Sequence, residues 1–464
     1  MTRYTVVLSL SLLALADTAD AADPISIGSR LELFVDRHLV ESLDGDAALK
    51  LHRPQPREVV LTTDEPWEGN TSAYYTFFQD GDLYRAYYRG AHYDEKTAKA
   101  GHREVTCYAE SRDGIHWTKP ELGIFEFGGS KKNNIVWDGI GTHCFAAFKD
   151  ANPVCPPDAR YKGIARGRPR GEKGLYVFKS PDGIHWSMMH DDPVITLGDF
   201  DSQNLAFWDP VRKLYVAYHR RSRDGKRDIM TETSTDFLTW TEPVYLDYPG
   251  APKEHLYTNA ILPYSRAPHI RLGFPTRYQP KNSQVEPTLM ASRDGLTFHR
   301  WPEALIPISA PKDRDGNRSN YMTWGLLDLP GRTRGLSVYA SEAYYTGPDS
   351  RVRRFTFRVD GFVSFHASMR GGTLLTKTLQ FTGDRLVLNY DASKAGGVRV
   401  QLETSEGQSL DGYSLADCGP LRGDAVEQAV VWNGGAVEEL AGKPLRIRFE
   451  ARSADVYSFR FTSR

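Results

Sequence analysis

The chain has 464 residues, with 58 lysines and arginines against 59 aspartates and glutamates, so its formal net charge at pH 7 is −1. This balance excludes a general nucleic-acid binder and a polybasic membrane-surface protein, because both depend on an excess of cations. Aromatic residues make up 12% of the chain, which also contains 40 glycines and 27 prolines. Rings and turn-forming residues in such numbers favour many short strands over helices.

The first residues have the features of a secretory signal peptide. Arg3 precedes an apolar run from Val6 to Ala16, and Ala19-Asp20-Ala21 fits the small-x-small cleavage pattern. The run is too short to span a bilayer, and no later segment approaches the required length. We therefore expect a secreted or periplasmic protein that is cleaved near Ala21 and Ala22.

Four cysteines follow this segment. An oxidising compartment permits disulfides, and Cys144 and Cys155 are close enough in sequence to bridge one hairpin. Cys107 and Cys418 are interpreted as lone buried thiols. Because the CxxC spacing of zinc sites is absent, we expect neither a structural zinc site nor a redox site.

A seven-residue motif recurs along the chain. Ser111–Trp117 reads Ser-Arg-Asp-Gly-Ile-His-Trp and returns at Ser180–Trp186, with weaker copies at 234–240, 292–298 and 358–365. The motif aspartates follow one another at intervals of 69, 54, 58 and 66 residues, which fits one four-stranded propeller blade per copy. We expect each aspartate to accept backbone N–H groups across a tight turn, while the final aromatic ring packs between neighbouring sheets. A structural rather than a catalytic role is predicted for Asp113, Asp182, Asp236, Asp294 and Asp360.

An apolar strand precedes each copy and is predicted to line a central channel. These inner strands are expected at residues 72–78, 142–148, 202–208, 257–263 and 320–326. Five inner strands and five motif copies predict an all-β fold, with a five-bladed β-propeller over residues 22–365. Short alternating strands predict a C-terminal β-sandwich over residues 366–464, and Leu31–Val35 is expected to add an edge strand.

Blade topology predicts which polar residues meet at one end of the channel. Turns between the first and second strands share a face with the motif turns, so Asp80, Asp150 and Asp209 are interpreted as turn residues. Residues that precede the inner strands, or follow the second strands, share the opposite rim. On that rim we expect Glu68, Asp199, Asp201, Glu254, Glu342, Arg89, Arg166, Arg220, Arg277, His143, Gln203, Asn204, Tyr257 and Asn320.

The chemistry of this rim predicts cleavage of an anionic glycan. Arginines from four blades favour a carboxylate or a sulfate, which accepts paired hydrogen bonds from guanidinium groups. Glycoside cleavage needs one protonated carboxyl for the leaving oxygen and one carboxylate that activates water or attacks directly. We interpret Glu68 and Asp201 as this pair, with Glu254 and Glu342 in reserve. Substrate binding is assigned to Arg89, Arg166, Arg220, Arg277, His143, Gln203, Asn204, Tyr257 and Asn320.

With its five-fold repeat, its Ser-x-Asp-Gly-x-x-Trp motif and its C-terminal sandwich, the chain resembles the five-bladed propeller glycosidases of glycoside hydrolase families 32, 43, 68, 117 and 130. The sandwich is similar to that of family 32. The resemblance implies an acidic residue at the start of blade one, where Glu68 stands instead of the usual Asp. It implies a second Asp in blade two, where the chain has Thr142-His143, and a third carboxylate at Asp199 or Asp201. It also allows a calcium ion in the channel, and no other cofactor is expected.

Other functions stay open. A non-catalytic glycan-binding propeller would need aromatic platforms, such as Trp67, Tyr93 and Tyr344, but no carboxylate pair. A sialidase-like enzyme would use Tyr257 or Tyr344 as the nucleophile, although sialidases have six blades. A lyase would abstract a proton from an acidic sugar with Tyr, His and Arg.

The expected partner is an anionic carbohydrate, and we expect no nucleic-acid or membrane partner and a monomer or small homo-oligomer. No metal site is predicted, because the spacings of His92, His102, His143 and His219 match no local ligand motif.

Overall fold

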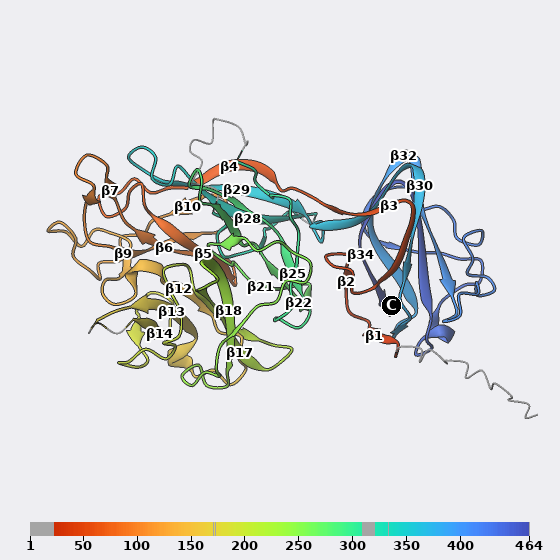
Figure 1. The fold of residues 1–464 in the computed structure, drawn as a ribbon, viewed down its shortest axis with the longest axis horizontal. Coiled ribbons are helices and arrows are strands. Elements are labelled where there is room, and N and C mark those ends of the chain that lie inside the picture. The colour runs from red at the N-terminus through yellow and green to blue at the C-terminus, as the bar shows by residue number, and fades with distance from the viewer. Residues whose placement is uncertain (1–22, 170, 172, 309–320, 333, 464) are drawn as a thin grey trace, which may run out of the picture.

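The computed structural model describes residues 23–169, 171, 173–308, 321–332 and 334–463. The expected signal peptide and Asn320 therefore lie outside the described residues. Figure 1 shows two β-rich bodies side by side, a propeller and a sandwich, joined by extended segments. Among the described residues, no helix is long and apolar enough to cross a membrane.

Five antiparallel sheets form the blades of the propeller, as the motif count predicted. From the channel outward, blade one contains β5 (Ala73–Asp80), β6 (Leu83–Gly90), β9 (Val105–Ser111) and β10 (Trp117–Thr118). Blade two contains β12 (Ala146–Lys149), β13 (Tyr161–Gly167), β14 (Gly174–Ser180) and β15 (Ser187–Met188). Blade three contains β16 (Leu205–Asp209), β17 (Leu214–Arg223), β18 (Lys226–Ser234) and β19 (Val244–Tyr245).

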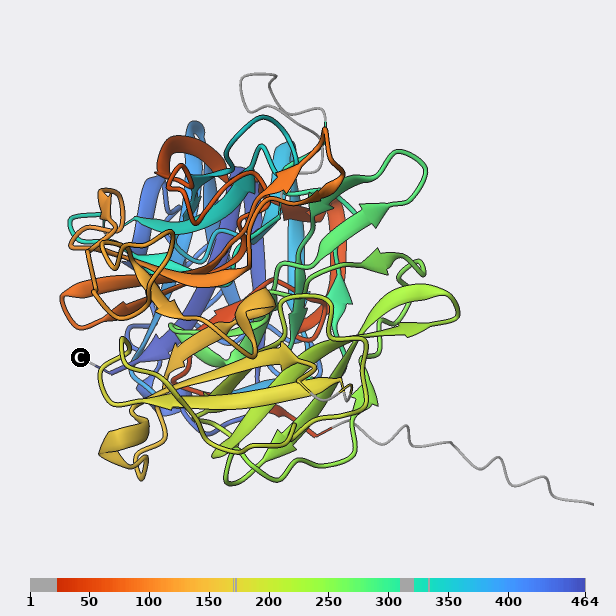
Figure 2. The ribbon, with the colours of Figure 1, turned by 90° about the vertical axis from the view of Figure 1, so that its left-hand side faces the viewer.

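Blades four and five complete the ring, which Figure 2 shows from another side. Blade four contains β21 (Leu262–Tyr264), β22 (Ala267–Gly273), β25 (Met290–Ser292) and β26 (His299–Arg300). Blade five contains β27 (Leu327–Asp328), β28 (Gly335–Glu342), β29 (Arg351–Arg358) and β4 (Gln55–Thr62). Its outermost strand thus comes from the start of the chain, so the ring is closed by pairing distant segments.

Four of the five motif copies form the expected turns. In each, the aspartate Oδ1 accepts two backbone N–H groups at 2.7–2.8 Å, and the serine hydroxyl two residues earlier donates to the same oxygen. Gly183 in the second copy has a φ of 80°, a conformation that a glycine adopts without strain. The side chain of Trp186 packs 5.9 Å from the Tyr87 ring of blade one, so the aromatic residue lies between blades as predicted.

Tyrosines on second strands connect these turns to the neighbouring blade. The hydroxyl of Tyr87 donates to the carbonyl of Gly183 at 2.6 Å, and Tyr218 donates to Gly295 at 2.9 Å. Tyr339 of blade five donates to Gly114 of blade one at 2.7 Å. The last contact shows that blades five and one are neighbours in a closed ring.

The fifth motif copy is an exception, because Asp360 forms no such turn. Its Oδ1 accepts the Tyr264 hydroxyl of blade four at 2.5 Å, and its Oδ2 accepts the Ser458 hydroxyl at 2.8 Å and the Asn389 amide at 3.2 Å. Ser458 and Asn389 belong to the sandwich. Asp360 is therefore structural, as predicted, but it joins the two bodies instead of fastening a blade.

The sandwich is built from long bent strands. Its main sheet has the order β3 (Val40–Leu51), β30 (Val363–Thr376), β34 (Arg446–Thr462), β32 (Arg385–Glu403) and β33 (Gly423–Ala429). Register shifts at 367–372 and 392–397 bend β30 and β32, so that they fold around a shared core. β2 (Glu32–Leu33) pairs with β34, as the expected edge strand.

The boundary expected between the two domains needs correction. β1 (Ile25–Gly28) pairs with β31 (Leu379–Phe381), and β3 pairs with β30, so residues 25–51 belong to the sandwich. These residues were assigned to the propeller because they precede its first blade in sequence.

The expected disulfide is also absent from the described residues. All four cysteines are free, and the Cys144 thiol accepts the backbone N–H of Arg166 instead of bonding to Cys155.

Candidate functional site

The inner strands begin later than predicted, and the residues before them form the mouth of the channel. β12, β16, β21 and β27 start three to seven residues after their expected first residues, and Thr142–Cys144 form a 3-10 turn. Left-handed backbone at Gly141, Phe200 and Ala260 turns the chain away from the strand direction at this end. The backbone of these segments is thereby released from sheet pairing, and His143, Asp201 and Tyr257 lie together at the channel mouth.

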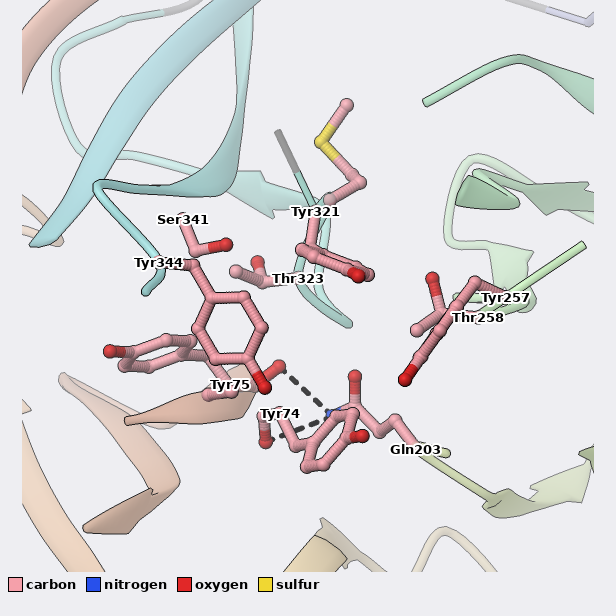
Figure 3. Close-up of a pocket in the computed structure, with 11 residues that line it drawn as sticks. Tyr74, Tyr75, Gln203, Tyr257, Thr258, Tyr321, Thr323, Ser341 and Tyr344 are labelled. Atoms are coloured by element: carbon pink, nitrogen blue, oxygen red, sulfur yellow. Dashed lines mark hydrogen bonds between the residues drawn. The ribbon is translucent and has the colours of Figure 1, made fainter. Parts of the chain in front are cut away.

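Tyrosines from several blades surround a pocket at the mouth (Figure 3). The pocket is open to solvent, and its lining includes Tyr74, Tyr257, Tyr321, Tyr344 and Gln203. The Gln203 amide donates to the carbonyls of Tyr74 and Tyr75 at 3.2 and 3.0 Å, which connects blade three to blade one beneath the phenols. Burial raises the pKa of Tyr74, Tyr257, Tyr321 and Tyr344, so their hydroxyls are neutral and can donate hydrogen bonds.

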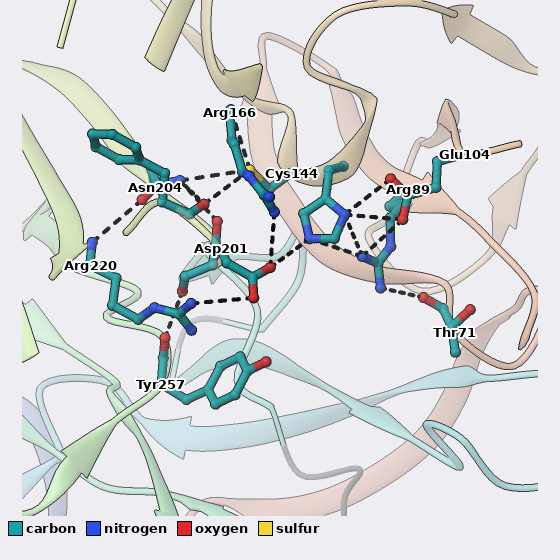
Figure 4. A network of polar contacts seen from close by, with 12 residues as sticks. Thr71, Arg89, Glu104, Cys144, Arg166, Asp201, Asn204, Arg220 and Tyr257 are labelled. Atoms are coloured by element: carbon teal, nitrogen blue, oxygen red, sulfur yellow. Dashed lines mark hydrogen bonds and ion pairs between the residues drawn. The ribbon is translucent and has the colours of Figure 1, made fainter. Parts of the chain in front are cut away.

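Asp201 lies at the centre of a cluster of charged residues beside this pocket (Figure 4). We call this cluster the charged wall; its other members are His143, Glu104, Arg89, Arg166 and Arg220. The Asp201 Oδ1 accepts hydrogen bonds from His143 Nε2 at 3.0 Å and Arg166 Nη1 at 3.2 Å, and its Oδ2 lies 3.4 Å from Arg220 Nη2. The hydrogen bond from His143, followed by the charges of Arg220 and Arg166, holds the Asp201 pKa well below its usual range. With 51% of its side chain exposed, Asp201 is an ionised carboxylate that a ligand can reach.

His143 connects Asp201 to a second carboxylate, Glu104. Its Nδ1 lies 3.0 Å from both Glu104 oxygens, while its Nε2 faces Asp201. Although burial opposes ionisation, the hydrogen bond from His143 and the charge of Arg89 lower the Glu104 pKa. Sequence analysis did not single out Glu104. It directly precedes β9, in the loop between the second and third strands, which the topological argument itself places on this rim.

Arg89 and Arg220 complete the charged wall on either side of Asp201 and His143 (Figure 4). Arg89 donates to the carbonyl of Thr71 at 2.7 Å and to the Tyr344 hydroxyl at 3.1 Å, and its guanidinium lies 4.9 Å from the Tyr74 ring centroid. Arg220 lies 5.1 Å from the Tyr257 centroid, and its Nε and Nη1 have no hydrogen-bond partner in the described chain. Three guanidinium groups therefore face two carboxylates, which leaves the wall with net positive charge and suits it to an anion.

Backbone strain is concentrated at this mouth. Tyr74, Phe200, Ala343 and Tyr345 have φ values of 58–60°, in the left-handed region that such residues rarely adopt. The conformation of Phe200 is held by its ring, which lies 5.3 Å from the His219 ring, and by its carbonyl, which accepts the Asn204 amide at 2.9 Å. Strained residues that the surrounding structure holds in place tend to gather at functional sites, and here they present Asp201 and Tyr344.

Glu68 does not contact Asp201. It is 2% exposed, accepts the Tyr88 hydroxyl at 2.5 Å, and pairs with Lys119 Nζ at 2.7 Å. Burial raises its pKa. None of these partners contacts the Asp201 network, so the predicted Glu68–Asp201 pair is not assembled.

The reserve carboxylates are engaged elsewhere too. Glu254 pairs with Arg277 at 3.1 Å and with Arg300, and Glu342 pairs with Arg351 and Arg353 at 3.0 and 2.8 Å. Arg277 also pairs with Glu286 at 2.7 Å, so it is not part of the wall.

The other predicted residues divide between the site and the scaffold. Arg89, Arg166, Arg220, His143, Gln203 and Tyr257 come together at the mouth. Asn204 is fully buried and binds the carbonyls of Phe200 and Ser202, so its amide supports the loop that carries Asp201. The Asp199 carboxylate accepts two hydrogen bonds from Ser222.

The residues at the mouth do not fit the calcium ion that the resemblance allows. In the described chain, no group of three or more His, Cys, Asp or Glu side chains could hold a metal ion. Asp201 and Glu104 instead face guanidinium and imidazole groups, which would repel a cation.

Comparison with known proteins gives similarity of structure alone. No protein-family model and no curated protein matches the chain. Among solved structures, a beta-1,2-mannobiose phosphorylase from Listeria innocua matches with a TM-score of 0.46 and 12% identity, over 66% of this chain and 96% of that one. A GH32 beta-fructofuranosidase from Bombyx mori matches with a TM-score of 0.43 and 9% identity, over 89% of this chain and 95% of that one. An endo-arabinase from Bacteroides thetaiotaomicron matches with a TM-score of 0.42 and 9% identity, over 65% of this chain and 98% of that one.

Proposed function

We propose that this chain is an exported enzyme that cleaves glycosidic bonds in an acidic or sulfated glycan at the mouth of the propeller. The observation that carries the proposal is the charged wall: two guanidinium groups and an imidazole contact one ionised, half-exposed carboxylate, and a third guanidinium lies behind the imidazole, all beside a pocket of neutral phenols. The guanidinium groups supply anion recognition, and the carboxylate and phenols supply groups that can move a proton.

The carboxylate pair expected from the sequence is replaced in this proposal by a carboxylate and a phenol. Tyr257 is the proton donor best placed for this role, because no described residue hydrogen-bonds its hydroxyl and its ring lies beside Arg220 and Asp201. In hydrolysis, Asp201 removes a proton from the attacking water, and the Tyr257 hydroxyl gives its proton to the leaving glycosidic oxygen. Proton transfer from Asp201, directly or through solvent, then restores the phenol.

A non-catalytic glycan-binding propeller is the second candidate. It is favoured by one observation: each of the four predicted catalytic carboxylates has a cationic partner. These pairs are Glu68 with Lys119, Asp201 with Arg166, Glu254 with Arg277, and Glu342 with Arg351. A carboxylate paired in this way can orient arginines for ligand binding, and it need not take part in a reaction.

The proposal is tested by incubating the purified mature chain with uronate-rich, sulfated and neutral polysaccharides and by analysing the products. New reducing ends without ultraviolet absorbance would support hydrolysis. Reducing ends with the absorbance of an unsaturated uronate would replace hydrolysis by elimination at the same site. Binding to acidic glycans without any product would favour the binding propeller.

Two variants connect the result to this site. Arg220→Gln should abolish cleavage of acidic glycans, whereas Arg277→Gln, which alters an arginine already paired with two glutamates, should leave it within about twofold of the wild type. Cleavage of neutral glycans alone, or equal loss in both variants, would overturn the proposal.

A further inference from the structure

Six tyrosines form a continuous arc of ring contacts beside the charged wall, where Tyr344 contacts Arg89 and Tyr257 contacts Arg220. In order of contact they are Tyr93, Tyr345, Tyr344, Tyr321, Tyr257 and Tyr278, and neighbouring ring centroids lie 4.7–6.0 Å apart. All six side chains are half-buried. Figure 3 shows the central members, Tyr344, Tyr321 and Tyr257, facing the pocket from three separate segments.

The six rings come from different blades, so the arc is not formed by packing within a single blade. Tyr93 lies on β7 (Tyr93–Asp94), beyond blade one, and Tyr344 and Tyr345 follow β28 of blade five. Tyr278 lies on β23 (Thr276–Gln279), which with β20 (His255–Leu256) and β24 (Gln284–Pro287) forms a small separate sheet near blade four. Rings from three blades therefore form one continuous series of contacts, of which Tyr344, Tyr321 and Tyr257 line the pocket.

Arg227 contacts the last two rings of the arc, Tyr257 and Tyr278. Its guanidinium carbon lies 5.0 Å from the Tyr257 ring centroid and 4.7 Å from that of Tyr278. Its other contact is with His255 Nδ1, which lies 3.4 Å from Nη1. In the described part of the chain, no carboxylate lies within ion-pair distance of Arg227, although nearly every other rim arginine has one. A half-buried guanidinium held between two rings, with no acidic partner among the described residues, is a cation prepared for an anionic ligand.

We propose that Arg227 and the tyrosine arc form an outer subsite. This subsite binds a second acidic sugar of the glycan whose first acidic sugar lies at the charged wall. This inference rests on the proposed function. All six rings are partly exposed, so the arc offers apolar ring surface to the C–H groups of a pyranose, together with hydroxyls for its polar edge. Arg220 of the charged wall and Arg227 both contact the Tyr257 ring. Two anionic groups on neighbouring sugars can therefore each pair with one of these arginines at the same time. The substrate class is then an oligomer with repeated acidic residues, not a glycan with a single terminal charge.

The test compares short and long ligands. Dissociation constants are measured by titration calorimetry for disaccharides and hexasaccharides of polygalacturonate and of chondroitin sulfate, at low and at moderate salt. For the acidic series that binds, the wild type should prefer the hexasaccharide. Arg227→Gln should weaken hexasaccharide binding about tenfold, leave disaccharide binding unchanged, and reduce the salt dependence of the hexasaccharide. Arg227→Lys should recover part of the loss.

Arg223→Gln is the matched control. Arg223 lies on the adjoining strand, and its guanidinium carbon is 4.5 Å from the Tyr245 ring centroid, but it is already paired with Asp228 at 2.5 Å. Its loss should leave both ligands unaffected. If Arg227→Gln binds the hexasaccharide as tightly as the wild type does, or loses both ligands equally, the outer subsite is wrong while the proposed function stands. If the wild type binds no acidic ligand, the proposed function and the outer subsite both fail.

Discussion

At the scale of single residues, the site depends on which carboxylates keep their charge and which are buried. Asp201 and Glu104 are surrounded by guanidinium and imidazole groups, so both are ionised at neutral pH. Glu68 is buried against Tyr88 and has a raised pKa, so burial opposes its charge. Carboxyl groups from neighbouring parts of the same rim thus differ, since two are ionised and burial opposes the charge of the third.

Glu68→Gln should affect stability, not turnover. The amide leaves Lys119 with Asp64, at 3.0 Å, as its remaining carboxylate partner. We expect a loss of about 1–2 kcal/mol in the free energy of unfolding, measured by chemical denaturation at pH 7. Turnover should stay within twofold of the wild type, because Glu68 has no contact with the charged wall. Loss of turnover with unchanged stability would instead restore Glu68 as a catalytic residue.

The acid limb of the activity profile should report the charges around Asp201. Its folded-state pKa lies below the unfolded value of about 3.9, so any stability or activity that needs the carboxylate is fully present above that value and is lost as the pH falls towards the folded pKa. The profile should therefore stay flat down to about pH 4. Arg166→Gln removes one neighbouring cation and should move the acid limb upward by about one pH unit. An unmoved limb in this variant would exclude Asp201 as the titrating group.

At the scale of elements, the propeller is held together by a short local turn repeated around the ring. The aspartate in each turn satisfies backbone N–H groups, and a tyrosine from the preceding blade donates to the carbonyl of the neighbouring glycine in three of the turns. The turns lie at the end of the channel opposite the mouth, so they stabilise blade contacts without entering the site.

Asp182→Ala should lower stability by about 1–2 kcal/mol, since the N–H groups of Ile184 and His185 lose their acceptor. Thermal unfolding measures the change. His185→Ala serves as the control, because it removes only an exposed contact with Asp182 and should cost less than about 0.5 kcal/mol. Activity at room temperature should persist in both variants. Equal effects on stability would show that the turn does not depend on the aspartate.

At the scale of the whole molecule, two bodies share one chain in an interleaved order. The N-terminal strands β1 to β3 complete the sandwich, the next strand closes blade five, and the chain returns to the sandwich through β30. Asp360 lies fully buried at the crossing, between Tyr264 of the propeller and Ser458 of the sandwich. The two bodies are therefore expected to unfold together.

Asp360→Asn should uncouple the two bodies. Removing one partner from a buried charged network costs about 3 kcal/mol, and Arg266 loses the nearer of its two carboxylates, at 3.0 Å, while Glu427 at 3.8 Å remains. Denaturation followed by tryptophan fluorescence and by far-ultraviolet circular dichroism should give coincident transitions for the wild type and separate ones for the variant. The exposed pair of Arg334 with Asp424 also crosses between the bodies, so Arg334→Gln provides a control with little effect. Coincident transitions in Asp360→Asn would contradict this role.

Local patterns could be read from the sequence, whereas long-range partners could not. The Asp turns and the blade count were predictable because each motif contains its own donors and acceptors within seven residues. The fate of Glu68 depends on Lys119, which is 51 residues away, and on how tightly the loop packs, so no local signal separates it from Asp201. Residues 25–51 were misassigned for the same reason, since their pairing partners lie more than 300 residues later. Glu104 was accessible to the topological argument and was overlooked because no motif marks it.

The most direct test of the central claim is a crystal structure of the Asp201→Asn variant soaked with an acidic hexasaccharide that the wild type binds. The account predicts one acidic group within hydrogen-bond distance of Arg220 and Arg166, a sugar ring against Tyr257, and a second acidic group at Arg227. A hexasaccharide bound to the sandwich, or at the opposite end of the channel, would contradict it.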